Sequence, residues 1–465
     1  MLIKRRLLKL LASMLVEATN RDRFTNAFIG LMAMWVGVLK KYWCLAIVIS
    51  VMNVQHSLAA EPIVIIVGID GLRADTLDRI PTVNLQYLAN KGVRANMIPA
   101  MPSKTFVNFY SLATGLYPEH HGMTSNYPYD RKMQRLFNRQ TDVQDPRWWS
   151  GEPIWATAEK QGIKAGIYFW VGSEAPVDGQ HPSFWLPYQQ NKDYAQRVEE
   201  VLGWLSLPEP QKPRLIMLYF SAVDTAAHDF GVDSTEEREA VLNVDRHVGE
   251  LISGLRKLGL EDQSNIMVVA DHGMVNLADN RLINLDEIID LSALQVADWT
   301  NRQTPQYAPF FALYGEQALI EQTYAQLSVY SAASTSAGRQ NHFQVMRRGE
   351  FPPNYHLDHP DRGPDLMIMA DVAWSLYASA DKSQVLPMAL TGRSVATHGY
   401  SNLDPRMHAT FIAAGPDVKQ SQSIEAFENI EVYGLVTCIL GIKPAATDGD
   451  ITGVQHLLSK NCPPN

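Results

Sequence analysis

Three aspartates and three histidines lie at predicted loops along this chain. Aspartate binds zinc through oxygen, and histidine binds it through nitrogen. Carboxylate and imidazole together suit a zinc ion, and six such ligands are enough for two ions with three protein ligands each. Any one of them taken alone is more often a loop cap or a structural histidine than a ligand. The six residues are Asp70, Asp224, His228, Asp271, His272 and His398.

A threonine at the predicted start of a helix is the candidate nucleophile. Pro102 and Ser103 predict the entry into a helix over 106–113 that ends near Gly115, so Thr105 falls at the helix N-terminus. Backbone N–H groups and the helix dipole favour a phosphate oxygen there. A threonine hydroxyl attacks only when a metal or a base activates it. The local pattern by itself favours the alternative interpretation, in which this threonine is a helix cap.

The elements that must position these residues are strands and helices in alternation. Apolar runs at 62–70, 215–220, 265–270 and 409–414 predict four buried strands, and the first three lead into an acidic residue or loop. The alternation predicts an α/β fold with a largely parallel central sheet sandwiched by helices. In such sheets ligands gather at the carboxyl ends of the strands. The sequence therefore predicts that the six residues meet at one edge.

Two helices and one insertion complete this organisation. A helix is predicted at about 82–91, and Ser234 with Glu237 predicts a capping box at the start of a second helix. The polar, proline-containing stretch 276–395 breaks the alternation, and we interpret it as an inserted lobe of a single domain over 61–465. The second helix carries one apolar face, made of Val241, Val244, Val248, Leu251, Ile252, Leu255 and Leu258.

Composition limits the partners of the chain. Its 465 residues are 46% hydrophobic and 19% charged, which is ordinary for a folded globular protein. The formal net charge of −9 gives no general attraction for nucleic acid, so no nucleic-acid duplex is expected as a partner. A small phosphorylated substrate is compatible with an acidic protein if metal ions reverse the field at the site.

The first 60 residues are expected to be a signal-peptide region. Lys40 and Lys41 precede a short apolar run at 44–52, and small residues follow up to positions 59–60, where cleavage is expected. The run is short for a transmembrane helix. The favoured interpretation is an exported protein, periplasmic or secreted, that contacts the membrane only through this signal. The alternative is a helical hairpin that anchors the chain.

The sequence upstream of that signal carries a further apolar stretch, at 24–38. We interpret the beginning as over-long, with a later methionine such as Met32 or Met34 as the true start. Two cysteines would remain in the mature chain, Cys438 and Cys462. They fit a disulfide in an oxidising compartment, or two unpaired buried thiols.

The motifs together resemble the nucleotide pyrophosphatase/phosphodiesterase family of the alkaline phosphatase superfamily. The resemblance begins with Pro-Ser-Lys-Thr-Phe-Val-Asn at 102–108 and Ala-Thr-Gly-Leu-Tyr-Pro-Glu at 113–119. It covers essentially the whole mature chain in the family's order, and the set of motifs is far more specific than any one of them. The remaining similar segments are His121-Gly122, Ile69-Asp70-Gly71, Asp224 with His228, Ala270-Asp-His-Gly273, Thr397-His-Gly399, 169–174 and 347–374.

The resemblance implies a zinc-dependent hydrolase that cleaves nucleotide diesters or pyrophosphates to nucleoside 5′-monophosphates through a covalent threonine intermediate. It assigns one of two zinc ions to Asp224, His228 and His398. It assigns the other to Asp70, Asp271, His272 and the hydroxyl of Thr105. It also implies that Asn126, with the backbone N–H of Phe106, binds a phosphate oxygen, and that the rings of Phe106 and Tyr219 flank a base. Core packing is the alternative interpretation of Tyr219.

Departures from the family pattern lie on the substrate side. Ser125-Asn-Tyr-Pro128 replaces a paired asparagine followed by methionine, Val171 replaces a common proline, and Ser-Ala-Val precedes Asp224. The alternatives are therefore a phosphodiesterase of choline phospholipids and a phosphomonoesterase of the same superfamily, for which Lys104 is the only cation near Thr105 in sequence. A phosphoethanolamine transferase would need several transmembrane helices, and a binding protein with a dead site is disfavoured by the complete ligand set.

Overall fold

The centre of the molecule is a mostly parallel sheet. The structure is a computed structural model that describes residues 61–338, 340–379, 394–420 and 422–462; the predicted signal-peptide region, 1–60, lies outside the described residues. The sheet has nine strands, and β20 (Phe427–Glu428) pairs with β2. Its order is β19 (Gln422–Ser423), β2 (Val93–Ile98), β18 (Ala409–Ala414), β8 (Ser264–Val269), β1 (Ile63–Ile69), β7 (Leu215–Phe220), β5 (Ala165–Tyr168) and β6 (Phe184–Leu186).

The register aligns the carboxyl ends of the inner strands. Ile69 of β1 pairs with Phe220 of β7, and Gly68 pairs with Val269 of β8, all in parallel. Every residue of these three strands is buried, which explains why each reads as an unbroken apolar run. Only β18 runs against its neighbours β8 and β2. The expected α/β class with a largely parallel sheet is confirmed.

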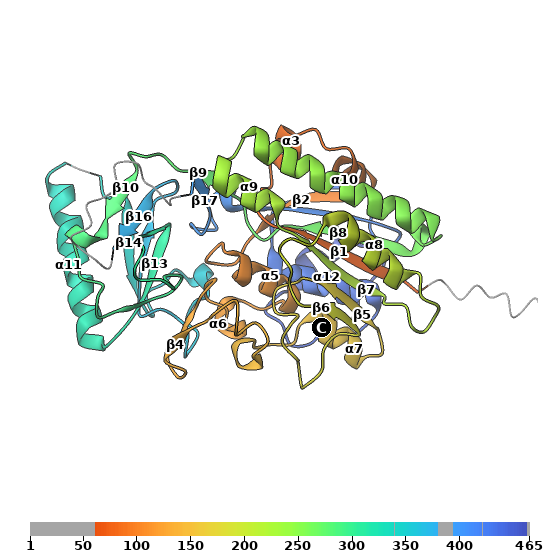
Figure 1. The fold of residues 1–465 in the computed structure, drawn as a ribbon, viewed down its shortest axis with the longest axis horizontal. Coiled ribbons are helices and arrows are strands. Elements are labelled where there is room, and N and C mark those ends of the chain that lie inside the picture. The colour runs from red at the N-terminus through yellow and green to blue at the C-terminus, as the bar shows by residue number, and fades with distance from the viewer. Residues whose placement is uncertain (1–60, 339, 380–393, 421, 463–465) are drawn as a thin grey trace, which may run out of the picture. The chain divides into compact units, whose positions relative to one another are not determined.

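Helices cover both faces of the sheet (Figure 1). On one face α10 (Thr235–Lys257) packs on α4 (Asn84–Lys91) and α8 (Tyr194–Leu205). On the other face α12 (Val432–Leu440) packs on β1, α5 (Thr105–Thr114) and α7 (Ile154–Lys160). Three further helices are α3 (Thr76–Arg79), α6 (Pro118–His121) and α9 (Ala222–Phe230).

Helix α10 differs from its prediction at both ends. Ser234 accepts from the Glu237 backbone N–H as expected, but the Glu237 carboxylate accepts from the N–H of Asp233 rather than from that of Ser234. It also binds Arg79. At the other end Leu258, assigned above to the buried face, is the C-cap and is 38% exposed, because the helix ends before this residue can turn towards the core.

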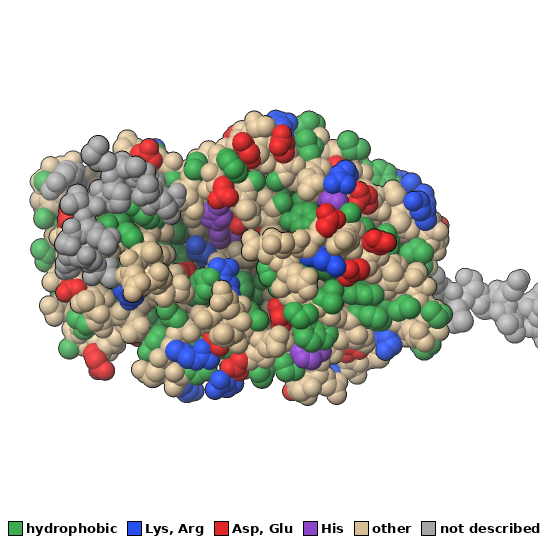
Figure 2. All heavy atoms as spheres, in the orientation of Figure 1, with side chains coloured by type: hydrophobic (Ala, Val, Ile, Leu, Met, Phe, Trp, Pro, Cys, Tyr) green, Lys and Arg blue, Asp and Glu red, His purple; other side chains and the backbone are tan. Residues whose placement is uncertain are grey.

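Residues 276–379 form two small sheets and one long helix. The first sheet has the order β10 (Leu282–Asn284), β16 (Ser375–Ala378), β12 (Gln306–Ala308). The second has the order β11 (Gln295–Val296), β13 (Phe310–Tyr314), β15 (Leu366–Ala370), β14 (Phe343–Arg347), and α11 spans Gln317–Ser336. Phe310 and Tyr314 of β13 pack with Met101 and Tyr129, two residues outside the large sheet. The surface is hollowed beside these two sheets, and histidine side chains lie in the hollow (Figure 2).

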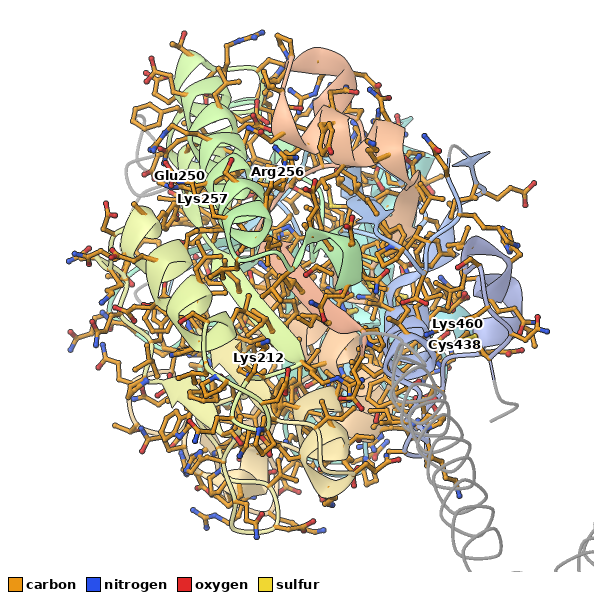
Figure 3. The ribbon with its side chains drawn as sticks, turned by 90° about the vertical axis from the view of Figure 1, so that its right-hand side faces the viewer. Lys212, Glu250, Arg256, Lys257, Cys438 and Lys460 are labelled. Atoms are coloured by element: carbon orange, nitrogen blue, oxygen red, sulfur yellow. A yellow bond between two sulfur atoms is a disulfide. The ribbon has the colours of Figure 1, made fainter. Side chains whose placement is uncertain are left out.

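Two short strand pairings and one disulfide complete the fold of the described residues. β9 (Val275–Asn276) pairs with β17 (Ala396–Thr397), and β3 (Tyr129–Asp130) pairs with β4 (Arg135–Leu136). Cys438 of α12 is bonded to Cys462 in a disulfide, one of the two possibilities that the sequence leaves open. Lys460 donates to the carbonyl of Ile439, the residue after Cys438. Figure 3 labels Lys460 next to Cys438. No helix among the described residues is long and apolar enough to span a membrane.

Candidate metal and catalytic site

The carboxyl ends of β1 and β8 deliver three of the predicted ligands. Asp70 follows β1 directly, and Asp271 and His272 come two and three residues after β8 ends. Gly71 has a φ of +70°, and a Cβ on it would lie 2.9 Å from Asp224 Cα, so only glycine allows this approach. The backbone N–H of Gly71 donates to Asp271 Oδ1 at 3.0 Å. The close parallel pairing of the two strands therefore sets the spacing of these carboxylates.

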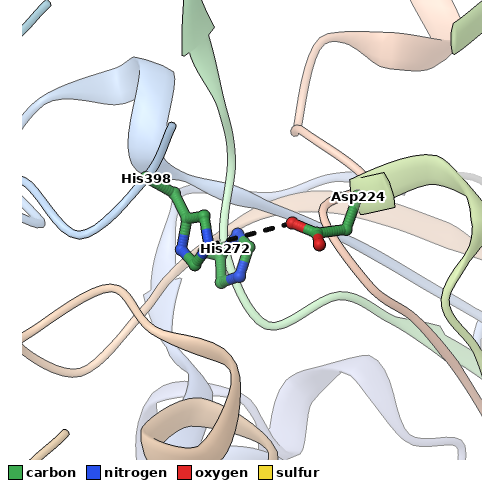
Figure 4. Close-up of side chains that lie close together, drawn as sticks. All are labelled: Asp224, His272 and His398. Carbon is green, nitrogen blue, oxygen red and sulfur yellow. Dashed lines mark ion pairs between the residues drawn. The ribbon is translucent and has the colours of Figure 1, made fainter. Parts of the chain in front are cut away.

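Helix α9 and the loop after β17 supply the other three. Asp224 and His228 lie four residues apart on α9, and His228 Nε2 is 3.4 Å from Asp224 Oδ1. His398 Nε2 is 3.8 Å from the same oxygen. The ring of His398 stacks on that of His272 with centroids 3.5 Å apart. Figure 4 shows His272, His398 and Asp224 converging from three separate segments.

The structure brings all six predicted ligands into one cluster, and two overlapping groups within it have a geometry that could hold a metal ion. Asp224, His272 and His398 form one group, and Asp70, Asp271 and His272 form the other, with ligand atoms within 4.8 Å of one another in each. His272 belongs to both groups. His228, which the resemblance assigns to the first ion, stands at the edge of that group through its contact with Asp224.

The histidine tautomers suit metal ligation. His228 Nδ1 lies 2.8 Å from the carbonyl of Ala396, His272 Nδ1 lies 2.9 Å from that of Gly273, and His398 Nδ1 lies 2.7 Å from that of Ser103. A carbonyl only accepts, so each Nδ1 carries a proton, and the neutral form of each ring has its lone pair on Nε2. Three imidazoles fixed in this way, with Nε2 turned towards carboxylates, form a typical ligand set.

The carboxylates leave oxygen atoms for a cation. Asp70 Oδ1, Asp224 Oδ1 and Asp271 Oδ2 are buried and have no hydrogen-bond partner. An unpaired buried carboxylate oxygen is costly, and three in one cluster need a common counter-charge. The donor set of aspartates and histidines therefore fits a metal such as zinc.

The pKa values of the buried groups point the same way. Burial, with the charges of Asp271 and Asp224, raises the pKa of Asp70 well above its ordinary value. Burial raises the pKa of Asp271 to about 7. Burial also lowers the pKa of His272 and, more strongly, that of His398, so both imidazoles favour the neutral form that binds metal. In the absence of a cation, these carboxylates resist ionising together.

Thr105 lies beside this cluster at the first position of α5. Lys104 is the N-cap, so Thr105 is not a cap, and its hydroxyl lies 3.4 Å from His272 Nε2. The helix ends at Gly115 with a φ of +65°, close to the predicted end. Ser103 connects the threonine loop to the ligands: its carbonyl accepts from His398, and its hydroxyl accepts from the N–H of Gly399. Ser103 therefore connects the candidate nucleophile, Thr105, with the candidate metal ligand His398.

Asn126 accepts from the first turn of α5. The backbone N–H of Phe106 donates to Asn126 Oδ1 at 2.9 Å, so the two groups predicted to bind one phosphate oxygen are adjacent. Asp298 brackets this asparagine: it accepts from the Ser125 hydroxyl at 2.5 Å and from the Tyr127 N–H at 2.7 Å. The sequence did not single out Asp298, because 172 positions separate it from Asn126 and only the fold joins them.

Replacing Asp298 by glycine is expected to lower kcat about 10- to 100-fold with a smaller change in KM, since a displaced asparagine stabilises the transition state poorly. Glycine is chosen because Asp298 has a φ of +61°. Steady-state kinetics on a nucleotide diester measures this effect. Asp371→Gly, which removes a carboxylate that pairs with His342, is the matched control. Equal losses in the two variants would contradict a positioning role for Asp298.

Tyr219 is buried in β7 and is 7% exposed. Its hydroxyl donates to Asp70 Oδ2 at 2.5 Å, and its ring meets that of Phe109 edge to face. Little of the ring is free to flank a base, which stays a prediction from the resemblance. The observed contact fixes one oxygen of Asp70 and leaves the other, Oδ1, for a cation.

Removing that hydroxyl in Tyr219→Phe is expected to weaken metal binding about 10-fold or more, as loss of a supporting hydrogen bond does at other metal sites. Competition with a chelator measures the affinity. Tyr168→Phe is the control, because Tyr168 is a buried tyrosine of β5 whose hydroxyl donates to Glu200, outside the cluster. Unchanged metal affinity in Tyr219→Phe would rule out the supporting role.

Phe106 lies in a group of aromatic side chains beside the threonine. Its ring centroid is 5.8 Å from that of Phe137 and 6.2 Å from that of Trp149. The guanidinium of Arg139 lies 5.4 Å from the Phe106 ring, so the site has a second cation besides Lys104. The ring of Phe106 is half-buried and adjoins the nucleophile, which is compatible with its predicted contact with a base.

The fold and the cluster define a class of protein: metal-dependent hydrolases whose ligands lie at the carboxyl edge of a mostly parallel sheet. Comparison with known proteins identifies the family. The family model described as type I phosphodiesterase/nucleotide pyrophosphatase matches residues 64–401. The chain is therefore a member of this family of hydrolases, which act on phosphodiester and pyrophosphate bonds.

Individual relatives agree with this assignment. An uncharacterized pyrophosphatase/phosphodiesterase of Schizosaccharomyces pombe is 35% identical over 402 residues, which are 85% of this chain and 80% of that protein. Ectonucleotide pyrophosphatase/phosphodiesterase family member 1 of Mus musculus is 33% identical over 86% of this chain and 43% of its own length. Murine ectonucleotide pyrophosphatase/phosphodiesterase 5, solved as an inactive variant with AMP, superposes with a TM-score of 0.75 at 27% identity, covering 86% of this chain and all of that chain.

Proposed function

We propose that the chain is an exported two-zinc phosphodiesterase that hydrolyses nucleotide diesters or pyrophosphates to nucleoside 5′-monophosphates, with Thr105 as nucleophile. The observation that carries the proposal is the Thr105 hydroxyl at a helix N-terminus, 3.4 Å from His272 Nε2 and beside three unpartnered carboxylate oxygens. The family supports the reaction class. The AMP bound to the murine relative supports a nucleotide as substrate.

The residues take separate roles in this reaction. Asp224, His228 and His398 would hold one zinc ion, and Asp70, Asp271 and His272 the other. When bound, the two ions lower the pKa of the threonine hydroxyl and neutralise charge on the oxygens around phosphorus. The Thr105 oxygen forms its bond to phosphorus as the bond from phosphorus to the leaving oxygen breaks. Water then cleaves the threonine ester and releases the nucleoside 5′-monophosphate.

Charge that develops on the phosphate needs donors in place before the reaction. The Phe106 N–H lies in the first turn of α5, where N–H groups have no partner within the helix, and in this structure it donates to Asn126 Oδ1. A phosphate oxygen that replaces this acceptor would meet the N–H and the Asn126 side-chain amide together, both held by the fold. The half-buried ring of Phe106 offers a face for a base.

Export is supported by two observations. The disulfide between Cys438 and Cys462 suits an oxidising compartment. Relatives include the venom phosphodiesterase of Naja atra, 32% identical over 401 residues. The signal-peptide prediction for 1–60 gives the same compartment.

Rates on two nitrophenyl esters test the proposal. The zinc-loaded protein is expected to hydrolyse the nitrophenyl ester of thymidine 5′-monophosphate much faster than nitrophenyl phosphate, and chelation is expected to remove this activity. A preference for the monoester would instead support a phosphomonoesterase. A preference for the nitrophenyl ester of phosphocholine would support a phosphodiesterase of choline lipids.

A further inference from the structure

Arg139 stands apart from the other basic residues of its segment. Between 131 and 147, Arg131, Lys132, Arg135 and Arg147 each form an ion pair with an aspartate. Among the residues that the structure describes, Arg139 has no such carboxylate partner. It is exposed, and its contacts are with two aromatic rings. The chain has a net charge of −9, so carboxylates are plentiful. A guanidinium that pairs with none of them at the proposed catalytic site is therefore available to bind an anionic ligand.

The two rings place this guanidinium beside the reacting groups. Its Cζ lies 4.3 Å from the ring centroid of Tyr127 and 5.4 Å from that of Phe106. Tyr127 follows Asn126 and Phe106 follows Thr105, so Arg139 rests on the neighbours of both predicted phosphate-contacting residues. The rings of Tyr127 and Phe106 hold the planar guanidinium, while its N–H donors stay exposed to solvent.

Lys104 is a second cation on this side of the site. It is the N-cap of α5, directly before Thr105, and its Nζ lies 5.8 Å from the ring centroid of Phe310. Two cations thus accompany Thr105, one partly buried and one exposed. Figure 2 shows Lys and Arg side chains next to histidines in the hollow. This side of the site therefore suits a substrate with more negative charge than a single diester phosphate.

We propose that Arg139 is a specificity-determining residue that binds a second anionic group of the substrate, next to the phosphate that Thr105 attacks. The inference rests on the proposed function and narrows it. It favours nucleoside polyphosphates, whose leaving group is itself a phosphate, over diesters with an uncharged leaving group. A planar guanidinium binds a phosphate through two parallel hydrogen bonds, whereas it repels the ammonium group of a choline ester.

Two thymidine substrates isolate this effect because they share one nucleoside. Thymidine 5′-triphosphate has pyrophosphate as leaving group, and the nitrophenyl ester of thymidine 5′-monophosphate has nitrophenolate. In Arg139→Gln the ratio of kcat/KM for the triphosphate to that for the ester is expected to fall about 10- to 100-fold. The change should lie mostly in KM, and Arg139→Lys should restore part of the ratio.

The experiment also needs a control variant that loses the same charge elsewhere and a measurement on the unmutated protein. Arg256→Gln removes an exposed arginine that pairs with Glu261 at the far end of α10, just before the amino end of β8 (Figure 3), and should leave the ratio unchanged. In the unmutated protein, added salt should lower kcat/KM for the triphosphate more than for the ester. This readout holds even if Arg139→Gln folds poorly.

The outcomes separate the two proposals. Zinc-loaded protein that cleaves neither thymidine substrate contradicts the proposed function. Protein that cleaves both, with the same ratio in Arg139→Gln and no selective effect of salt, contradicts the role of Arg139 alone. An equal loss on both substrates would place Arg139 at the shared nucleoside monophosphate and would also overturn the inference.

Discussion

Thr105→Ala is expected to lower kcat/KM for a nucleotide diester by about 10⁴- to 10⁶-fold, the range seen when a hydrolase loses its nucleophile. The variant keeps the backbone N–H groups of α5 and all six acidic and histidine residues, so binding of metal and substrate should survive. The loss should therefore lie in kcat. Steady-state kinetics, with zinc content measured on the same samples, checks this result.

Thr105→Ser is the matched control for the nucleophile. Serine keeps the hydroxyl near His272 Nε2 and loses only the methyl group, so a far smaller loss is expected than with alanine. Diester hydrolysis by Thr105→Ala at a rate near that of the unmutated protein would show that another group attacks phosphorus. Activity lost equally in the serine variant would indicate a structural defect in this loop.

His272→Ala is expected to have the second largest effect, a loss on the order of 10³-fold, because each bound ion contributes several kcal/mol to catalysis. Its Nε2 is 2.9 Å from Asp271 Oδ2 and 3.5 Å from Asp70 Oδ1, and the residue belongs to both candidate metal groups. Zinc content should fall together with activity.

His247→Ala provides the comparison for this variant. His247 is also buried, but it lies on α10 and contacts Glu250, outside the cluster. Its replacement should lower stability without changing the zinc content of the folded protein. If His272→Ala retained full zinc content and lost activity no more than His247→Ala, the assignment of His272 as a zinc ligand would be wrong.

Much of the fold could be predicted because its inner strands are buried on both faces. The runs at 215–220 and 409–414 match β7 and β18 residue for residue, while the third run is shifted by one position from β8. Burial of every residue produces a continuous apolar signal, which marks such strands clearly. Strand direction carries no such signal, so the antiparallel placement of β18 could not be derived from its sequence.

The ligand cluster was also predictable, whereas its supports were not. Strand ends and motif spacing indicate Asp70, Asp271 and His272. The bond from Tyr219 to Asp70 and the cradle of Asp298 around Asn126 depend on segments that meet only in the folded chain. Arg139 is 34 positions from Thr105 in sequence and lies at the site through its contacts with the rings of Phe106 and Tyr127. No local sequence pattern predicts these contacts.

Zinc titration of the metal-free protein tests the central claim most directly. Hydrolysis of the thymidine nitrophenyl ester would be followed as zinc is added to chelated, buffer-exchanged protein. We predict no activity without metal and a rise that saturates at two equivalents of zinc per chain. Full activity of the metal-free protein, or saturation at one equivalent, would contradict a two-zinc phosphodiesterase.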